Sequence, residues 1–187
     1  SEQPIGIVPS IEKAVREAAR ALLLRSPSAD TAKATPAYVR REMRREEERL
    51  SPAERASRGR ALAAAGDARR AAKLLSRDPP GSWPESERGR NFLALARAEA
   101  ALGHSVSARA AAARVPDGTP ESFEARLLEN DLLLASLRKE EASMPPADDP
   151  RLASLRRALH RIAVDSAART VRNAARERLL LLAAEAK

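Results

Sequence analysis

The sequence predicts an all-α protein, built as a right-handed α-solenoid of short antiparallel helix pairs. Alanine and leucine supply most of the 43% hydrophobic content and favour helices, whereas the β-branched and aromatic residues that favour strands are scarce. Prolines also precede successive apolar segments, and one stretch of sequence returns 37 residues further along the chain. The composition therefore indicates helices, and the repeat indicates how they are arranged.

Residues 1–50 are predicted to form an N-terminal tail, a helix, a mobile connector and a charged helix. Ser10 is a suitable N-cap for the first helix, over about residues 11–25, whose apolar residues return at helical spacing: Ile11, Val15, Ala18 and Leu22. Residues 26–35 are small and polar, which is typical of a mobile connector between two helices.

The second helix is expected to begin at Pro36 and to be mostly charged. Its charged residues are placed to pair at helical spacing, for example Arg44 with Glu48. Its apolar residues form only a thin stripe: Val39, Met43 and Leu50. We favour a solvent-exposed helix with weak ion pairs over a basic recognition helix, because acidic residues interrupt the basic run.

Residues 51–187 are predicted to form the repeat array, with helix pairs beginning near residues 52, 84, 120 and 150. Ser51, Pro52 and Glu54 have the types and spacing of a capping box with a proline at the first helical position. Three later segments begin with a proline in the same way: Pro84, Pro120 and Pro150.

A four-residue pattern accompanies the 37-residue repeat. We expect its glycine to end a first helix, its alanine to let two helices cross closely, its third residue to pack one turn further on, and its proline to stop the second helix. The pattern occurs at Gly66, Ala71, Leu75 and Pro79, and again at Gly103, Ala108, Ala112 and Pro116.

This pattern resembles the tetratricopeptide (TPR) family of helix-pair repeats, in a degenerate form. The resemblance is best over residues 52–79, where Gly59 also matches the glycine of the family's first helix. In the second unit, Ala96 and Ala112 stand at the first-glycine and large-residue positions. The resemblance implies a superhelix of TPR-like pairs whose concave face binds a protein.

The short pairs are also similar in style to the superhelical, non-catalytic part of periplasmic soluble lytic transglycosylases and to TPR lipoproteins of the cell envelope. That similarity implies a bacterial periplasmic or envelope location, although the chain itself leaves exported and cytoplasmic origins open. In the transglycosylase family the catalytic acid lies in a Glu-Ser dipeptide, which occurs here at Glu85 and Glu121. Both glutamates follow a proline at a helix start, where a carboxylate complements the helix dipole, so we expect no catalysis from them.

Other candidates for chemistry are equally weak. His104 and His160 lack a second metal ligand at helical spacing, no glycines cluster into a phosphate-binding loop, and the chain has no cysteine. The longest apolar run, residues 179–184, is far shorter than the roughly 20 residues that span a membrane. We therefore expect no catalytic residue, no cofactor, no metal and no membrane span.

The formal net charge of +8 is unevenly distributed. Residues 119–150 hold eight acidic and three basic residues, between two basic segments. This acidic block predicts a site for a basic or mixed-charge partner. Three arginines that share one side of the final helix are candidates for contact with an anion: Arg169, Arg172 and Arg176.

The sequence thus favours a non-enzymatic helical-repeat scaffold that mediates protein–protein interaction, in a cell-envelope system if the resemblance holds. Its partner would be a peptide segment or a larger assembly. Two alternatives stay open. One is the helical part of a lytic transglycosylase-like peptidoglycan enzyme without its catalytic domain, and the other is a basic nucleic-acid-binding helical protein, although four scattered aromatic residues supply no stacking platform.

Overall fold

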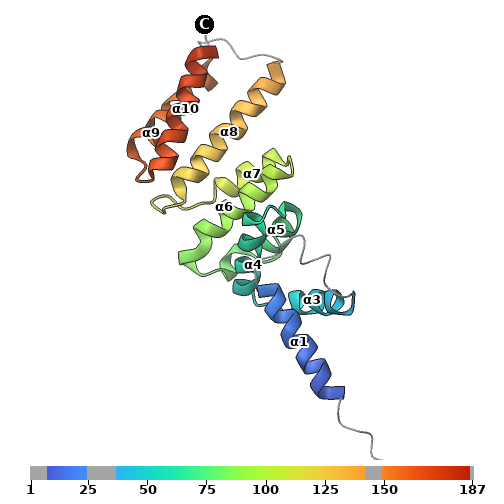
Figure 1. Ribbon diagram of the computed structural model, residues 1–187. Coiled ribbons are helices and arrows are strands. Elements are labelled where there is room, and N and C mark those ends of the chain that lie inside the picture. The colour runs from blue at the N-terminus through green and yellow to red at the C-terminus, as the bar shows by residue number, and fades with distance from the viewer. Residues whose placement is uncertain (1–7, 25–36, 142–148, 186–187) are drawn as a thin grey trace, which may run out of the picture. The chain divides into compact units, whose positions relative to one another are not determined.

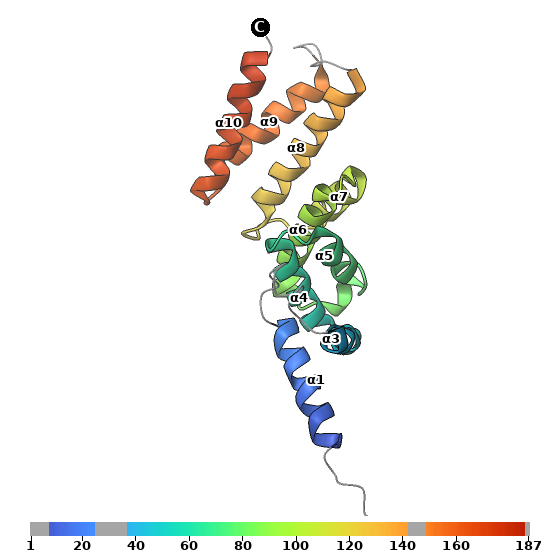
Figure 2. The same cartoon turned by 45° about the vertical axis from the view of Figure 1, so that its right-hand side comes forward.

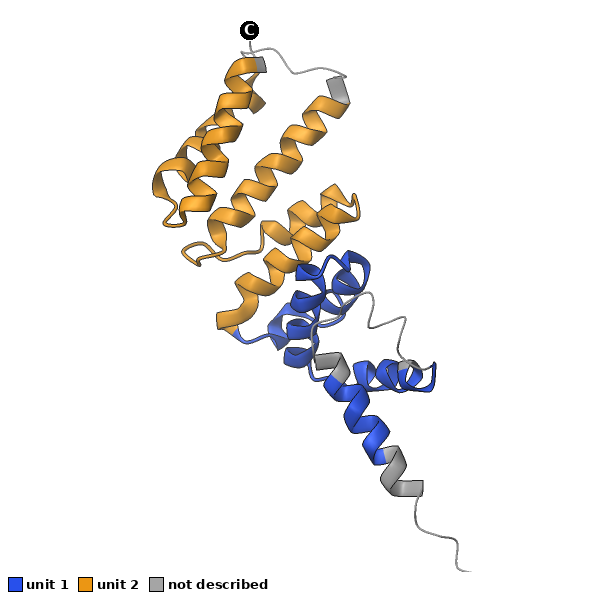
Figure 3. Cartoon of the chain, in the orientation of Figure 1, with its two compact units in different colours: residues 1–84 blue, residues 85–187 orange. Residues whose placement is uncertain are grey.

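The computed structural model describes residues 8–24, 37–141 and 149–185. Within these ranges the chain forms nine α-helices, one short 3-10 helix and no strand, which confirms the all-α prediction. None of the described helices is both long and apolar enough to cross a membrane. The chain divides into two compact units, Ser1–Pro84 and Glu85–Lys187 (Figure 3). The division predicted at residue 50 stays a prediction.

The first unit begins with helices α1 (Val8–Leu24) and α3 (Ala37–Arg49), which pack against each other (Figure 1). Since α1 already begins at Val8, the prediction of Ser10 as its N-cap is wrong. One residue of the predicted apolar face is also wrong. Ala19 is fully buried and Ala18 is exposed, because the buried stripe runs from Val15 to the residue four places on.

Several of the N-terminal predictions fall on residues that the structure does not describe. They concern the connector over residues 26–35, Pro36, and the side chains of Ile11 and Leu22.

Helix α3 is charged, as predicted, but its pairs differ from the predicted one. Its inner side includes Val39, half-buried Met43 and the carboxylate of Glu46, and Leu50 is buried just after the helix. Glu46 accepts a hydrogen bond from Arg49 at 2.8 Å. Among the described side chains, Arg44 and Glu48 are both exposed and no ion pair joins them, because the ion pairs within this helix form at i,i+3 rather than i,i+4 spacing.

Helix α4 (Pro52–Ala64) starts with the predicted capping box, which is confirmed. The backbone N–H of Glu54 donates to the Ser51 hydroxyl, and the Ser51 backbone N–H donates to the Glu54 carboxylate at 3.0 Å. That backbone hydrogen bond, followed by those from the Ser51 hydroxyl and Arg20, lowers the pKa of Glu54. The cap therefore depends on an ionised carboxylate.

Helices α4 and α5 (Ala68–Leu75) form a tight hairpin. Gly66 adopts φ 83° between them, a conformation that favours glycine, and the N–H of Asp67 reaches back to the Leu62 carbonyl at 2.9 Å. In the hairpin interior a Cβ on Gly59 would lie 2.6 Å from Cγ of Leu75, so the two helices cross where Gly59 has no side chain. Ala71 and Leu75 are buried beside this crossing.

A second hairpin, α6 (Glu85–Ala101) and α7 (Ser105–Ala112), belongs to the second unit. The end of its first helix and both ends of its second lie 37 residues after those of the α4/α5 hairpin. Gly103 adopts φ 80° in its loop, equivalent to Gly66. Three alanines in its interior have no exposed surface: Ala96, Ala108 and Ala112.

The two prolines of the repeat do not stop the second helices. Helix α5 ends at Leu75 and α7 ends at Ala112, so Pro79 and Pro116 each follow four residues later. The last turn after α7 is already tightened by hydrogen bonds from residues 114 and 115 to carbonyls three residues before them, and such bonds end a helix without help from proline. Pro79 instead precedes the 3-10 helix η1 (Pro80–Ser82) and buried Trp83.

Where we expected a third helix pair from residue 120, the structure has one continuous helix, α8 (Ser122–Glu141). It packs against a hairpin of α9 (Pro150–Asp165) and α10 (Arg169–Glu185), and Figures 1 and 2 both show the three helices together. Their core is made of apolar side chains: Leu134, Leu137, Leu152, Leu155, Leu159, Ile162, Ala163, Val171, Ala175 and Leu182.

The predicted proline starts hold to within two residues. Pro52 and Pro150 are the first residues of α4 and α9, whereas Pro84 immediately precedes α6 and Pro120 stands two residues before α8.

Candidate functional site

A groove of about 730 Å³ lies within the second unit, where α7, the turn before α8, α8 itself and α9 meet. Helix α8 lines it with residues at i, i+1, i+4, i+7, i+8 and i+11 spacing. Helix α9 lines it with residues at i, i+3, i+4, i+7 and i+8 spacing. The lining residues are Arg109, Asp117, Gly118, Ser122, Phe123, Arg126, Glu129, Asn130, Leu133, Ser154, Arg157, Ala158, Arg161 and Ile162.

The groove has an apolar floor. Phe123 and Leu133 are half-buried and pack against the α8/α9/α10 core, of which Ile162 is a member. Because the core covers Phe123 and Leu133 on one side only, part of each side chain is available at the groove, whereas Ile162 is buried beneath it. When a ligand removes such partly covered apolar surface from water, the free energy of the system falls, which favours binding.

One of the four arginines in the groove is neutralised within the chain. The guanidinium of Arg126 donates to Glu129 at 2.9 Å and to Asp117 at 3.0 Å. These two hydrogen bonds, that to Glu129 first, raise the pKa of Arg126. The same ion pairs hold Asp117, on the turn, against α8 and occupy both carboxylates of the groove.

The other three arginines have no partner among the residues that the structure describes. Arg109 comes from α7, and Arg157 and Arg161 come from successive turns of α9. All three are exposed, and none forms an ion pair or a side-chain hydrogen bond within that part of the chain. Three uncompensated cations therefore surround an apolar floor.

In the acidic block of residues 119–150, the carboxylates that the structure describes are paired within the chain, and the site for a basic or mixed-charge partner stays a prediction. Each of its acidic side chains that the structure describes pairs with an arginine of the same chain. The pairs are Glu121 with Arg90, Glu124 with Arg97, Glu129 with Arg126, Asp131 with Arg178, and Asp149 with Arg151. The block supplies internal counter-charges and leaves the groove arginines without any.

The arginines that the sequence singled out on the last helix do not form one site. Arg172 donates to the backbone carbonyls of Ser166 and Ala167, at 2.7 and 2.8 Å. It thereby caps the loop between α9 and α10. Arg169 and Arg176 are exposed and lie outside the groove.

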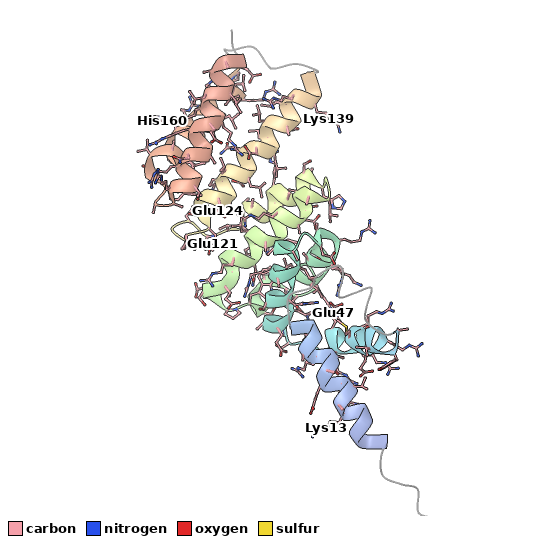
Figure 4. All side chains as sticks on the ribbon, in the orientation of Figure 1. Lys13, Glu47, Glu121, Glu124, Lys139 and His160 are labelled. Atoms are coloured by element: carbon pink, nitrogen blue, oxygen red, sulfur yellow. The ribbon has the colours of Figure 1, made fainter. Side chains whose placement is uncertain are left out.

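The Glu-Ser dipeptides and the histidines are not brought together. Glu121 pairs with Arg90, and Ser122 donates to the Thr119 carbonyl at 2.7 Å (Figure 4 shows Glu121 near the start of α8). His104 lies in the α6/α7 loop, and its Nδ1 is 2.7 Å from Oε2 of Glu99. His160 is an exposed residue of α9. The described ranges contain no group of His, Asp and Glu suited to a metal ion.

The groove that Arg157 and Arg161 line with Arg109 and Phe123 was not predicted from the sequence. One signal for Arg109 was present. The 37-residue repeat places it at the position of Ala72, which is buried in the first hairpin, so an arginine there breaks the pattern of small residues. The repeat positions themselves do not line the groove and lie in or beside the two hairpins.

Comparison with known proteins adds no relative to this description. No family model matches the chain, and searches of curated proteins and of solved structures returned no match.

Proposed function

We propose that this protein is a non-enzymatic helical-repeat scaffold that binds a segment of another protein in the groove of its second unit. One observation carries the proposal, namely an apolar floor beside three arginines, from two helices, that have no partner among the described residues. Such a surface buries apolar side chains and orients charged ones, which is how peptide-binding grooves gain affinity and specificity.

The proposal includes a degenerate TPR-like repeat and a right-handed solenoid. Two hairpins with matched bounds and equivalent positive-φ glycines, Gly66 and Gly103, support the repeat. Fully buried alanines at equivalent positions of both hairpins, Ala71 and Ala108, also support it. Repeat proteins of this kind usually bind partners on the surface that their stacked helices present.

The polar groups of the groove support binding rather than catalysis. Asp117 and Glu129 both form ion pairs with Arg126, so the two carboxylates of the groove are engaged within the chain. The hydroxyl of Ser122 donates to a backbone carbonyl and has no adjacent base.

Affinity capture with charge-reversed variants tests this proposal. The full chain is immobilised as wild type, as the groove variant Arg157→Glu/Arg161→Glu, and as the matched control Arg169→Glu/Arg176→Glu. In each pair both arginines are exposed and have no partner among the described residues. Circular dichroism checks that each variant is folded. We expect specific proteins from a lysate of the source organism to bind the wild type and the control and to be lost from the groove variant. Capture that the groove variant retains in full, or no specific capture at all, would contradict the proposal.

A further inference from the structure

We infer that the groove recognises an acidic peptide segment, with two carboxylates and an apolar side chain that face the groove together. This inference rests on the proposed function and names the chemistry of the partner. It depends on three features of the described residues: the uncompensated charge, the spacing of the cations, and the apolar floor between them.

Charge complementarity selects an acidic partner. Four arginines and two carboxylates line the groove, so its net charge is +2. Both carboxylates pair with Arg126, and the other three arginines have no partner among the described residues. A carboxylate matches the planar fork of a guanidinium and accepts two parallel hydrogen bonds from it. A basic segment would instead meet three cations with no free carboxylate to offset them.

The spacing of the arginines defines how the carboxylates should be placed. Arg157 and Arg161 are four residues apart on α9, so their Cβ atoms are separated by about 5–6 Å. Acidic residues two apart on an extended segment, about 6.6 Å, match this spacing, as do acidic residues one turn apart on a helix. Arg109, on α7, faces the same groove from another helix and fixes the direction of the segment.

The apolar floor requires an apolar side chain in the same segment. Phe123, Leu133 and Ile162 line the groove, whose volume lies within the range of ligand pockets, about 300–1,000 Å³. An apolar side chain seated there would exclude water from the neighbouring ion pairs and strengthen them.

A nucleic acid fits the same groove less well. Phe123 is the only aromatic residue of the lining, whereas single strands are held by stacking on several aromatic side chains.

A peptide-display selection tests the inference directly. A random twelve-residue library is selected on the immobilised full chain, and the best peptides are synthesised with a fluorescent label for anisotropy titration. We expect enrichment of Asp or Glu at i,i+2 or i,i+4 spacing beside an apolar residue. Arg157→Glu/Arg161→Glu should weaken these peptides at least about tenfold, while Arg169→Glu/Arg176→Glu should change the Kd by no more than about twofold.

Four outcomes would overturn the inference: no enriched peptide, enrichment of basic or neutral peptides, equal weakening by both variant pairs, or tighter Arg157- and Arg161-dependent binding of a labelled thymidine oligonucleotide. The first three leave the proposed function standing if affinity capture still depends on the groove. Loss of groove-dependent capture would instead contradict the proposed function itself, so the two failures are distinguishable.

Discussion

The α4/α5 and α6/α7 hairpins share a backbone plan but are held together differently. In the first, Arg55 and Asp78 form a bidentate ion pair with distances of 2.7 and 2.9 Å, and both side chains are only 11% exposed. At the equivalent positions, 37 residues on, the second hairpin has Phe92 and Val115, both buried. The first hairpin thus has an ion pair between α4 and the residues just after α5, where the second hairpin has two apolar residues.

The crossing point of each hairpin shows a second exchange. The first hairpin combines Gly59 with Leu75, whereas the second has Ala96 and Ala112 at the equivalent positions. A large residue requires a glycine opposite it, and a small residue allows an alanine. The lesson is that a repeat can keep a close helix contact while changing both residues, because interiors are close-packed and the two side chains at a contact must fit each other.

We expect the largest effect on stability from a charged residue placed where α4 and α5 cross. Leu75 is 1% exposed, so Leu75→Asp removes a buried leucine and leaves a carboxylate without a partner. We expect the free energy of unfolding to fall by more than about 4 kcal/mol. Lys73→Asp, on an exposed position of the same helix, is the control. Thermal unfolding followed by circular dichroism measures both, and a wild-type melting curve for Leu75→Asp would disprove the packing described here.

We expect the second-largest loss of stability when the ion pair between Arg55 and Asp78 is broken. Asp78→Val leaves the Arg55 guanidinium without its partner and should cost about 2 kcal/mol, because a largely buried charge loses its counter-charge. The double variant Arg55→Phe/Asp78→Val copies the second hairpin and should recover to within about 1 kcal/mol of wild type. Urea unfolding measures both variants. If the double variant is less stable than the single one, the two hairpins do not use equivalent positions in the same way.

The smallest effect, and the sharpest test of the comparison, is a change of sign at Gly59. Gly59→Ala in the wild type should destabilise by about 1 kcal/mol, because its Cβ meets Cγ of Leu75. In a Leu75→Ala background the same change should stabilise by about 1 kcal/mol, since alanine is the better helix former once the space is open. A double-mutant cycle measured by urea unfolding gives both values. Additive effects, with no change of sign, would show that the two positions are independent.

Hydrogen exchange offers a common readout for these variants. The changes lie in the first unit, so exchange in α4 and α5 should rise while that in α6 and α7 stays as in the wild type. Faster exchange in both hairpins would show that the units unfold together.

Much of the fold could be predicted because its signals are local. The Ser51 capping box, the turn glycines Gly66 and Gly103, and the helix starts at Pro52 and Pro150 all act within a few residues of themselves. One error arose where the outcome depended on a neighbouring helix. Whether Ala18 or Ala19 faces inward depends on which side of α1 another helix covers, and the helical period allows either.

The groove lay beyond sequence reasoning for the same reason. Counts of arginines and carboxylates predicted a basic or mixed-charge partner for the acidic block, but three of the five ion pairs of its described carboxylates join residues far apart in the chain. Arg178 and Asp131 are 47 residues apart, and Arg97 and Glu124 are 27 apart. A net charge does not say which arginines are left over.

The starts of α4, α6 and α9 and the glycines that close the two matched hairpins could be predicted from the sequence, because caps, prolines and turn conformations act on near neighbours. The tertiary structure was needed to show that α8 runs as one helix against the α9/α10 hairpin, that the described carboxylates of the acidic block are paired within the chain, and that Arg109, Arg157 and Arg161 line one groove with an apolar floor. Those outcomes depend on which helix faces share a contact, and complementary packing over long stretches of chain selects them.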